Sequence, residues 1–163
     1  MFSQVFVALG ANLGDPAATV RAAIEALRGI AGTRFRAASS LYRTAPVGLK
    51  HQPDFINAVA MLEADDAVLP APTFLASLFA IEAAFGRERS VKNAPRTLDL
   101  DLLLYGDQTL DLPGLTLPHP RMTERAFVLA PLAEIAPDLK IPGHGRAADL
   151  LSAVADQPVE RLP

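Results

Sequence analysis

One segment constrains the fold of this chain more than any other, the eight residues LDLDLLLY at positions 98–105. It is rich in leucine and contains no glycine or proline, so its length and composition favour a buried strand. Side chains alternate between the two faces of a strand, which places Asp99 and Asp101 together on one face. The opposite face carries three leucines and is expected to face the core: Leu98, Leu100 and Leu102.

The aspartate face needs an explanation, because Leu103 and Tyr105 are expected to continue it as an apolar surface. One interpretation is the solvated side of an amphipathic strand. The alternative is a cation site, since an unpaired carboxylate in a half-buried patch is costly and a bound cation offsets that cost. A rise of about 3.3 Å per residue puts the two aspartates roughly 7 Å apart. They can therefore hold one or two hard cations, and oxygen ligands suit Mg²⁺.

The patterns along the first two thirds of the chain predict an α+β fold. Six elements are expected in the order strand, helix, strand, strand, helix, strand: residues 3–9, a helix from Pro16 through Leu27, residues 33–44, residues 54–64, a helix from Pro72 to Phe85, and residues 98–105. This order is that of a ferredoxin-like split β-α-β sandwich. We expect a mainly antiparallel sheet with the helices packed on one face.

The C-terminal part is expected to add further elements to that unit. They are a short strand at 115–118, a helix over 121–137 broken or kinked by Pro131, a short strand at 139–141 and a helix at 147–155. The last residues, 156–163, have the composition of a flexible tail. With 163 residues, the chain is expected to form one domain over residues 1–163.

Composition excludes several classes of function. The chain has no cysteine, which excludes disulfides, thiolate metal sites and a cysteine nucleophile. No apolar run approaches the roughly 18 residues of a membrane span, and the N-terminus lacks the basic region of a signal peptide. A net charge of -3 gives no overall basic field for nucleic acid or anionic lipid. We therefore expect a cytoplasmic protein without a nucleic-acid or membrane partner.

The cationic residues cluster around the aspartate strand. Two short flanking segments hold six of the fifteen lysines and arginines: Arg87, Arg89, Lys92, Arg96, Arg121 and Arg125. The planar guanidinium group suits phosphate recognition. Arg96 stands where the chain enters the strand, and Arg87 and Arg89 stand at the other end of the preceding loop. Arginines beside carboxylate-bound magnesium are the usual apparatus of phosphoryl or nucleotidyl transfer.

A second polar segment, LPHPRMTER at 117–125, places His119 between two prolines. Arg121 and Arg125 follow it with the i,i+4 spacing of one helical face. A lone histidine is more often a turn residue, but this setting favours contact with phosphate or nucleotide. The early turn GANLGD has no phosphate-binding lysine, so it is not a P-loop.

Two aromatic residues could hold a flat ring. Phe55 and Asn57 share one face of the strand at 54–64, where a ring can stack on the first and hydrogen-bond to the second. Phe127 is a candidate for the opposite wall. Ordinary core packing is an equally good interpretation of both phenylalanines.

The segment KNAPRTLDLDLLLYG matches a family signature, and five other segments align in the same order: ALGANLGD, SSLYRTAPVG, QPDFINAVA, IEAAFGRER and LPHPRMTERAFVLAPLAEIAPDL. Over nearly its whole length the chain resembles the 6-hydroxymethyl-7,8-dihydropterin pyrophosphokinases of folate biosynthesis. The resemblance implies Mg²⁺-dependent transfer of the β,γ-diphosphate of ATP to the hydroxymethyl oxygen of the pterin, with release of AMP.

The resemblance also implies roles for individual residues. Two Mg²⁺ ions would be held by Asp99 and Asp101. Catalysis would involve Arg87, Arg96, Asp99 and Asp101. ATP would be bound by Glu82, Arg87, Arg89, Arg96, Leu102, Thr116, His119 and Arg125. The pterin would be bound by Thr44, Val47, Phe55, Asn57 and Phe127. The chain departs from the family pattern in the loop GRERSVKNAPR, which has no Trp and carries Ser90, and at Pro120, where some members have an aromatic residue.

Two other classes of protein share some of these features. A two-metal nucleotidyltransferase also uses an aspartate pair on a strand, but it releases diphosphate and usually has a Gly-Ser start to its site, which is missing here. A non-catalytic ferredoxin-like module that binds RNA needs exposed aromatic residues and a basic sheet. Bare carboxylates at the sheet centre would repel its phosphates.

Overall fold

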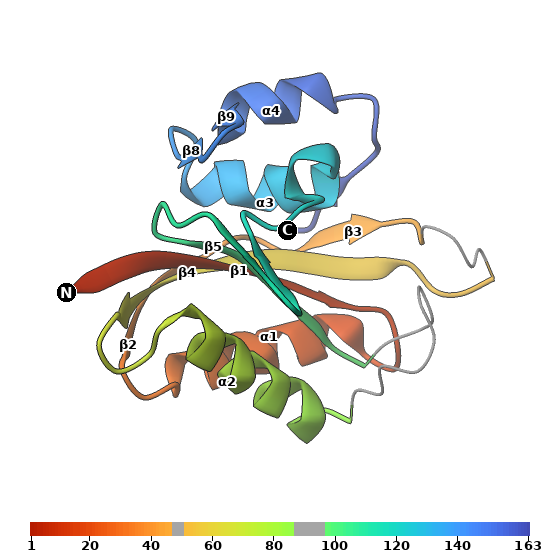
Figure 1. The fold of residues 1–163 in the computed structure, drawn as a ribbon. Helices are drawn as coiled ribbons and strands as arrows, with labels where there is room; N and C mark the ends of the chain where they lie inside the picture. The colour runs from red at the N-terminus through yellow and green to blue at the C-terminus, as the bar shows by residue number, and fades with distance from the viewer. Residues whose placement is uncertain (47–50, 87–96) are drawn as a thin grey trace.

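The computed structural model describes residues 1–46, 51–86 and 97–163 of the chain (Figure 1). Its elements in chain order are β1 (Phe2–Ala11), α1 (Pro16–Arg28), β2 (Thr33–Ala38), β3 (Tyr42–Thr44), β4 (Phe55–Asp65), α2 (Ala71–Ala84), β5 (Asp99–Tyr105), β6 (Leu110–Leu112), β7 (Leu115–Leu117), the 3₁₀ helix η1 (Met122–Glu124), α3 (Ala126–Ile135), β8 (Lys140–Ile141), β9 (Gly145–Arg146), α4 (Ala147–Ala153) and β10 (Glu160–Arg161).

The main sheet has the strand order β10-β3-β4-β1-β5, and β2 also pairs with β4. Its pairs are antiparallel. The longest ladder joins β1 to β4, from Phe2 opposite Asp65 to Ala11 opposite Ile56. The single strand predicted over residues 33–44 is two strands, β2 and β3. At Ser39 the backbone N–H still donates to the Val59 carbonyl at 2.9 Å, but the Val59 N–H donates to Ser39 Oγ at 3.0 Å in place of a backbone carbonyl. The mixed α/β fold with an antiparallel sheet is confirmed.

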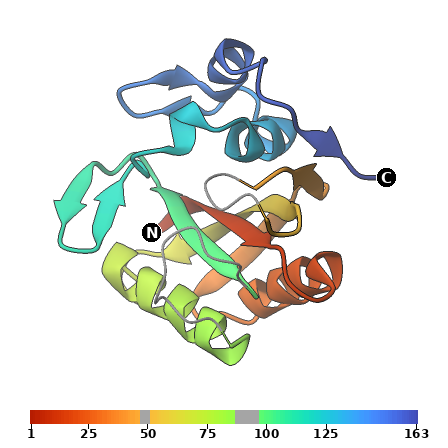
Figure 2. The same ribbon diagram turned by 90° about the vertical axis from the view of Figure 1, so that its right-hand side faces the viewer.

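Helices cover both faces of this sheet, whereas the sequence predicted helices on one face. In Figures 1 and 2, α1 and α2 lie on one side and α3 and α4 on the other. The reason is that β1 is buried on both faces. Val5 and Val7 belong to the core cluster that includes helix residue Phe74, and Phe6 belongs to a second cluster with Leu129. We call these the α1/α2 face and the α3/α4 face.

The end of β5 contains a β-bulge that the sequence did not reveal. Opposite β5, Val7 pairs with Leu102 but the preceding Phe6 pairs with Leu104, so Leu103 is an extra residue in the ladder. As a result, Leu103 and Leu104 both pack in the cluster on the α3/α4 face.

The bulge returns Tyr105 to the α1/α2 face, so the prediction that it continues the aspartate face is wrong. Its ring packs edge-on against Phe74 with 6.4 Å between ring centroids. Its hydroxyl donates to the Leu69 carbonyl at 2.7 Å. Burial, followed by the nearby Asp66 carboxylate, raises the pKa of Tyr105 to about 12.

The helix predicted over residues 121–137 is interrupted, and Arg125 is the residue at the break. Arg125 has an extended backbone, with φ -122° and ψ 114°, and separates η1 from α3. Arg121 and Arg125 therefore do not share one helical face, contrary to the prediction. Pro131 lies inside α3, which continues to Ile135.

The C-terminal residues pack against the sheet instead of forming the free tail expected over residues 156–163. Glu160 pairs with Arg43, Arg161 pairs with Tyr42, and the Leu162 N–H donates to the Leu41 carbonyl at 2.9 Å. The Leu162 side chain also packs on the core of the α1/α2 face. Within the described residues, none of the helices has the length and apolar character needed to cross a membrane.

Candidate functional site

A cavity of about 1000 Å³ opens on the α3/α4 face, where β1, β4 and β5 meet the start of α3. Seven of the predicted site residues line it: Thr44, Phe55, Asn57, Asp99, Asp101, Arg125 and Phe127. They come from positions up to 83 residues apart in the chain, taking Thr44 and Phe127 as the extremes. The fold thus brings the aspartate pair and the predicted ring-binding residues into one space.

The amide of Asn57 is held at the floor of this cavity. Asn57 is only 6% exposed, and its Nδ2 donates to Thr44 Oγ1 at 2.9 Å. In the ladder it lies opposite Gly10, and a Cβ added to Gly10 would come within 3.2 Å of Asn57 Oδ1. The missing side chain at Gly10 therefore leaves room for the amide.

Asn12 ties the segment before β4 to the end of β1. It is 1% exposed, and its Nδ2 donates to Gln52 Oε1 at 2.7 Å and to the Pro53 carbonyl at 3.1 Å. These bonds fix the chain just ahead of Phe55. The sequence around Asn12 carries no signal for these bonds, because the partners lie 40 and 41 residues away.

Asp99 and Asp101 both line the cavity from β5, where they lie opposite Gly10 and Ala8 of β1. The alternation predicted for this part of the strand is confirmed, since Leu100 between them is buried in the core of the α1/α2 face. Asp101 keeps 37% of its side chain exposed. Both carboxylates therefore face the cavity and not the core of the α1/α2 face.

His119 lies beside the aspartate pair. Its Nε2 is 4.0 Å from Asp101 Oδ1, and its backbone N–H donates to the Leu103 carbonyl at 2.9 Å. Burial, and then the neighbouring Arg125, lower the pKa of His119, although the Asp99 charge opposes them. Its Nδ1 accepts a hydrogen bond from the Arg121 N–H at 3.2 Å. The neutral ring therefore carries its proton on Nε2, toward Asp101.

The donor set suits magnesium brought by a phosphate ligand. Among the described residues no group of three or more acidic or histidine side chains could hold a metal. The cavity offers the two carboxylates of Asp99 and Asp101. In nucleotide sites Mg²⁺ is commonly held by one or two carboxylates together with substrate phosphates and water. Asp99 and Asp101 fit that pattern.

Glu82 supports the aspartate strand from behind. It is 2% exposed on α2, and its Oε2 accepts a hydrogen bond from the Leu100 N–H at 2.7 Å. Leu100 stands between the two aspartates, so this bond fixes the backbone at the middle of the pair. Glu82 itself does not belong to the described lining of the cavity.

The remaining predicted residues fall into two groups. Leu102 is buried in the core of the α1/α2 face, and Thr116 is exposed on the β6–β7 hairpin, which extends from the side of the molecule (Figure 2). Neither belongs to the described lining of the cavity. Four others lie outside the described residues: Val47, Arg87, Arg89 and Arg96.

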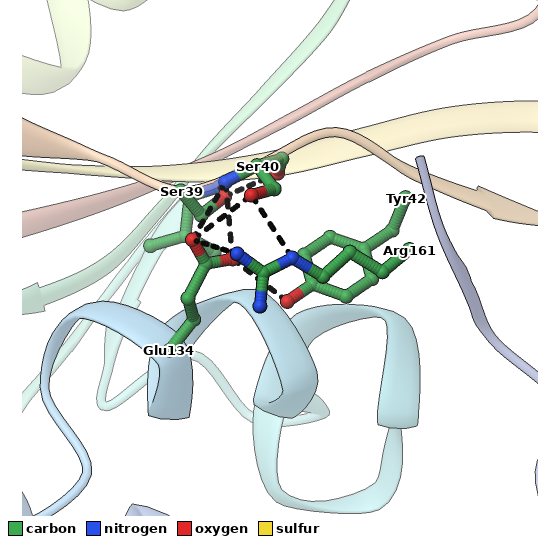
Figure 3. Close-up of polar contacts among 6 residues, drawn as sticks. Ser39, Ser40, Tyr42, Glu134 and Arg161 are labelled. Carbon is green, nitrogen blue, oxygen red and sulfur yellow. Dashed lines mark hydrogen bonds and ion pairs between the residues drawn. The ribbon is translucent and has the colours of Figure 1, made fainter. Parts of the chain in front are cut away.

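A polar cluster lies between the C-terminal end of α3 and the start of β3 (Figure 3). The Glu134 carboxylate accepts hydrogen bonds from Tyr42 Oη at 2.7 Å and from the Ser40 backbone N–H at 3.0 Å. Arg161 donates to Ser40 Oγ at 3.1 Å and lies 3.4 Å from Glu134 Oε2. No local pattern predicts this cluster, because its members are spread from residue 40 to residue 161.

The cluster shifts the pKa values of its two main members. Burial alone would raise the pKa of Glu134, but the hydrogen bonds from Tyr42 and Ser40, with the charge of Arg161, outweigh it and lower that pKa. Burial, and then the hydrogen bond to Glu134, raise the pKa of Tyr42 to about 12. The carboxylate is therefore ionised and the phenol is protonated at neutral pH.

Comparison with known proteins gives a consistent result. Residues 6–137 match the family described as 7,8-dihydro-6-hydroxymethylpterin-pyrophosphokinase (HPPK). The chain is 47% identical over 163 residues to the 2-amino-4-hydroxy-6-hydroxymethyldihydropteridine pyrophosphokinase of Pseudomonas aeruginosa, covering 100% of this chain and 99% of that one. It is 39% identical over 157 residues to the enzyme of the same name from Haemophilus influenzae, covering 96% of each.

Solved structures are similar in fold. Wild-type Plasmodium falciparum HPPK-DHPS with pteroate superposes with a TM-score of 0.75 at 12% identity, over 96% of this chain and 43% of that chain. The chain thus spans less than half the length of this solved protein. At that identity the likeness concerns the fold alone.

Proposed function

This chain belongs to the 7,8-dihydro-6-hydroxymethylpterin-pyrophosphokinase family, and from that premise we propose that the cavity on the α3/α4 face is its active site. The reaction transfers the β,γ-diphosphate of ATP to the hydroxymethyl oxygen of 6-hydroxymethyl-7,8-dihydropterin and releases AMP, a step of folate biosynthesis. One observation carries the assignment of the site. A single cavity contains both the aspartate pair of β5 and the Phe55–Asn57 pair of β4.

The pterin would occupy the end of the cavity formed by β3, β4 and α3. Phe55 and Phe127 line the same space and suit the two faces of a flat ring. The Asn57 amide, oriented by Thr44, would hydrogen-bond to the edge of the ring. Val47 would contribute from the segment that lies outside the described residues.

The triphosphate would occupy the end formed by β5 and the start of α3. Arg125 lines the same cavity as the aspartate pair and would act there as a cation. His119 Nε2 is 4.0 Å from Asp101 Oδ1 and would act as a neutral donor. We propose that Arg87, Arg89 and Arg96 add positive charge there. In the same proposal Glu82, Leu102 and Thr116 contribute to the nucleotide site from outside the described lining of the cavity.

Two Mg²⁺ ions held by Asp99 and Asp101 would neutralise phosphate charge and lower the pKa of a bound hydroxyl group. The chain's own residues need not supply a strong base. Stacking and the Asn57 amide orient the hydroxymethyl group, and the arginines orient the diphosphate in line with it. Positioning and charge neutralisation would then supply most of the rate.

Several broader properties belong to the same proposal. The strand order, with β5 and β4 on either side of β1, supports a ferredoxin-like split β-α-β core with C-terminal additions. Residues 1–163 would form one domain. The protein would act as a cytoplasmic monomer on small molecules, without nucleic acid or membrane partners.

The product nucleotide tests this proposal directly. The protein is incubated with MgATP and 6-hydroxymethyl-7,8-dihydropterin, and the nucleotides are separated by chromatography. We expect AMP in equal amount to the pterin diphosphate, and none without the pterin. Release of free diphosphate would indicate a nucleotidyltransferase instead, and ADP would indicate a simple kinase.

A further inference from the structure

The C-terminal segment, residues 157–162, touches both sides of the proposed substrate cavity. Gln157, Pro158 and Val159 line the cavity together with Phe127. Directly after them, β10 pairs with β3, the strand that ends at Thr44. The segment therefore connects the start of α3 to the pterin side of the site.

The side chain of Gln157 hydrogen-bonds to the backbone on both sides of Arg125. Its Nε2 donates to the Glu124 carbonyl at 2.8 Å, and its Oε1 accepts from the Ala126 N–H at 2.9 Å. In a strand, the carbonyl before a residue and the N–H after it point to the same side, as in an antiparallel ladder. Arg125 has such an extended backbone, so the amide pairs with it as a neighbouring strand would.

The same contact caps α3. The first N–H groups of a helix have no acceptor within the helix. Arg125 is the N-cap residue, and within the described chain its side chain makes no capping bond. Gln157 supplies the acceptor for Ala126 from 31 positions away, and its own N–H donates to the Val154 carbonyl at 3.0 Å.

Two proposed substrate contacts depend on this geometry. Arg125 lies between the two residues to which Gln157 hydrogen-bonds, and Phe127 lies in the first turn of the capped helix. The Arg125 guanidinium carbon is 5.4 Å from the centroid of the Phe127 ring, so the two side chains lie against each other. The backbone conformation at residue 125 therefore sets where a cation and a ring wall face the cavity.

The other end of the segment is anchored by the cluster in Figure 3. Arg161 donates to Ser40 Oγ at 3.1 Å and lies 3.4 Å from Glu134 Oε2. Glu134 in turn accepts from Tyr42 Oη, on the strand that leads to Thr44. Both ends of the segment are thus fixed to elements that carry proposed site residues.

We propose that Gln157 is a positioning residue for substrate binding and that residues 157–162 hold the start of α3 at its working distance from β3. This inference rests on the proposed function, in which Arg125 and Phe127 contact the substrates. Without the amide, Arg125 is free to leave the extended conformation, and the binding site loses its preorganised form.

The test is the variant Gln157→Met in the full chain, which keeps the side-chain length and removes both hydrogen bonds. We expect the KM values for ATP and for the dihydropterin to rise about fivefold, the loss expected for one or two neutral hydrogen bonds, with a smaller change in kcat. Amide hydrogen exchange at Ala126 should accelerate by a similar factor. Gln157→Glu keeps only the hydrogen-bond acceptor, so its KM values should lie between those of the parent and those of Gln157→Met. Gln108→Met, at an exposed residue after β5, is the matched control, and its KM values and its exchange at Ala126 should equal those of the parent.

Unchanged KM values in Gln157→Met overturn the proposal, whatever happens to thermal stability, because a purely structural contact would lower Tm alone. Unchanged exchange at Ala126 also overturns it. Failure of the proposed function is distinguishable from both results. In that case Arg125→Ala and Phe127→Ala would themselves leave the KM values unchanged. Exchange at Ala126 would still accelerate in Gln157→Met, because the two hydrogen bonds are lost whether or not the cavity binds these substrates.

Discussion

The two faces of the sheet are built from the same strands, but one face forms the apolar core and the other carries the cavity. On the α1/α2 face, β1, β4 and β5 contribute side chains to one continuous apolar core with both helices. On the α3/α4 face, the apolar cluster covers only part of the sheet. The same face also carries the cavity, whose lining includes Asn57, Asp99 and Asp101.

This difference separates stability from chemistry within single strands. In β5, Leu100 packs into the core of the α1/α2 face while Asp99 and Asp101 on either side of it line the cavity. Burial of apolar area on one face offsets the cost of keeping carboxylates half-buried on the other. Substitutions on the two faces should therefore affect different measurements.

The largest expected effect is on the cavity side. Asp99→Asn or Asp101→Asn keeps the side-chain shape but removes charge that a metal ion needs, so AMP formation should fall about a thousandfold. Thermal stability should stay within a few degrees of the parent. Asp111→Asn, on the exposed strand β6, is the matched control and should keep full activity. Near-normal turnover in either cavity variant would show that the pair is not the metal site.

The opposite pattern is expected on the α1/α2 face. Phe74 is fully buried and packs against Tyr105, so Phe74→Ala should lower the free energy of unfolding by about 3–5 kcal/mol. Well below its lowered Tm, the variant should keep its KM values. Urea denaturation followed by circular dichroism measures the first effect, and steady-state kinetics measures the second. Leu112→Ala, at a residue that is 45% exposed, should change stability by less than about 0.5 kcal/mol. A large KM change in Phe74→Ala would mean that the two faces are coupled.

The sequence predicted the parts of this arrangement that depend on local pattern. Period-two alternation identified Asp99, Leu100 and Asp101 correctly as an aspartate face and a core face. The two predicted helices end within one residue of the ends of α1 and α2. Asp15 Oδ1 accepts from the Ala18 N–H at 3.1 Å, and Gly86 follows α2 with φ 81°.

Features that depend on distant partners were not predictable in this way. Tyr105 changes face because of a bulge set by pairing with β1, for which residues 98–105 alone carry no signal. Gln157 and Arg161 lie in a short, polar, proline-containing segment, and only the folded chain supplies their partners on α3 and β3. Burial of β1 on both faces likewise depends on the C-terminal helices.

A smaller effect should follow from filling the space at Gly10. A Cβ there would come within 3.2 Å of Asn57 Oδ1, so Gly10→Ala should displace the amide by a few tenths of an ångström. We expect the KM for the dihydropterin to rise about tenfold, with little change in the KM for ATP, because only the ring end of the cavity is affected. Gly29→Ala is the control, since its Cβ would make only an ordinary contact at 3.5 Å with the Ala26 carbonyl. Equal changes in both KM values would contradict the division of the cavity into a ring end and a phosphate end.

The smallest effect concerns the boundary between the α3/α4 helices and the sheet, and it depends on pH. The pKa of Glu134 is lower in the folded chain than its usual value of 4.5, so its carboxylate stabilises the fold above that value. This contribution is lost as the pH falls through the folded-state pKa. Glu134→Gln should therefore be less stable than the parent by about 1 kcal/mol at pH 7, and the difference should shrink steadily below pH about 4.5. Thermal unfolding of both proteins from pH 3 to pH 7 measures it. Glu25→Gln, at an exposed ion pair with Arg28, should show almost no difference at any pH. A difference for Glu134→Gln that stays constant with pH would mean that the side chain contributes through packing and not through its charge.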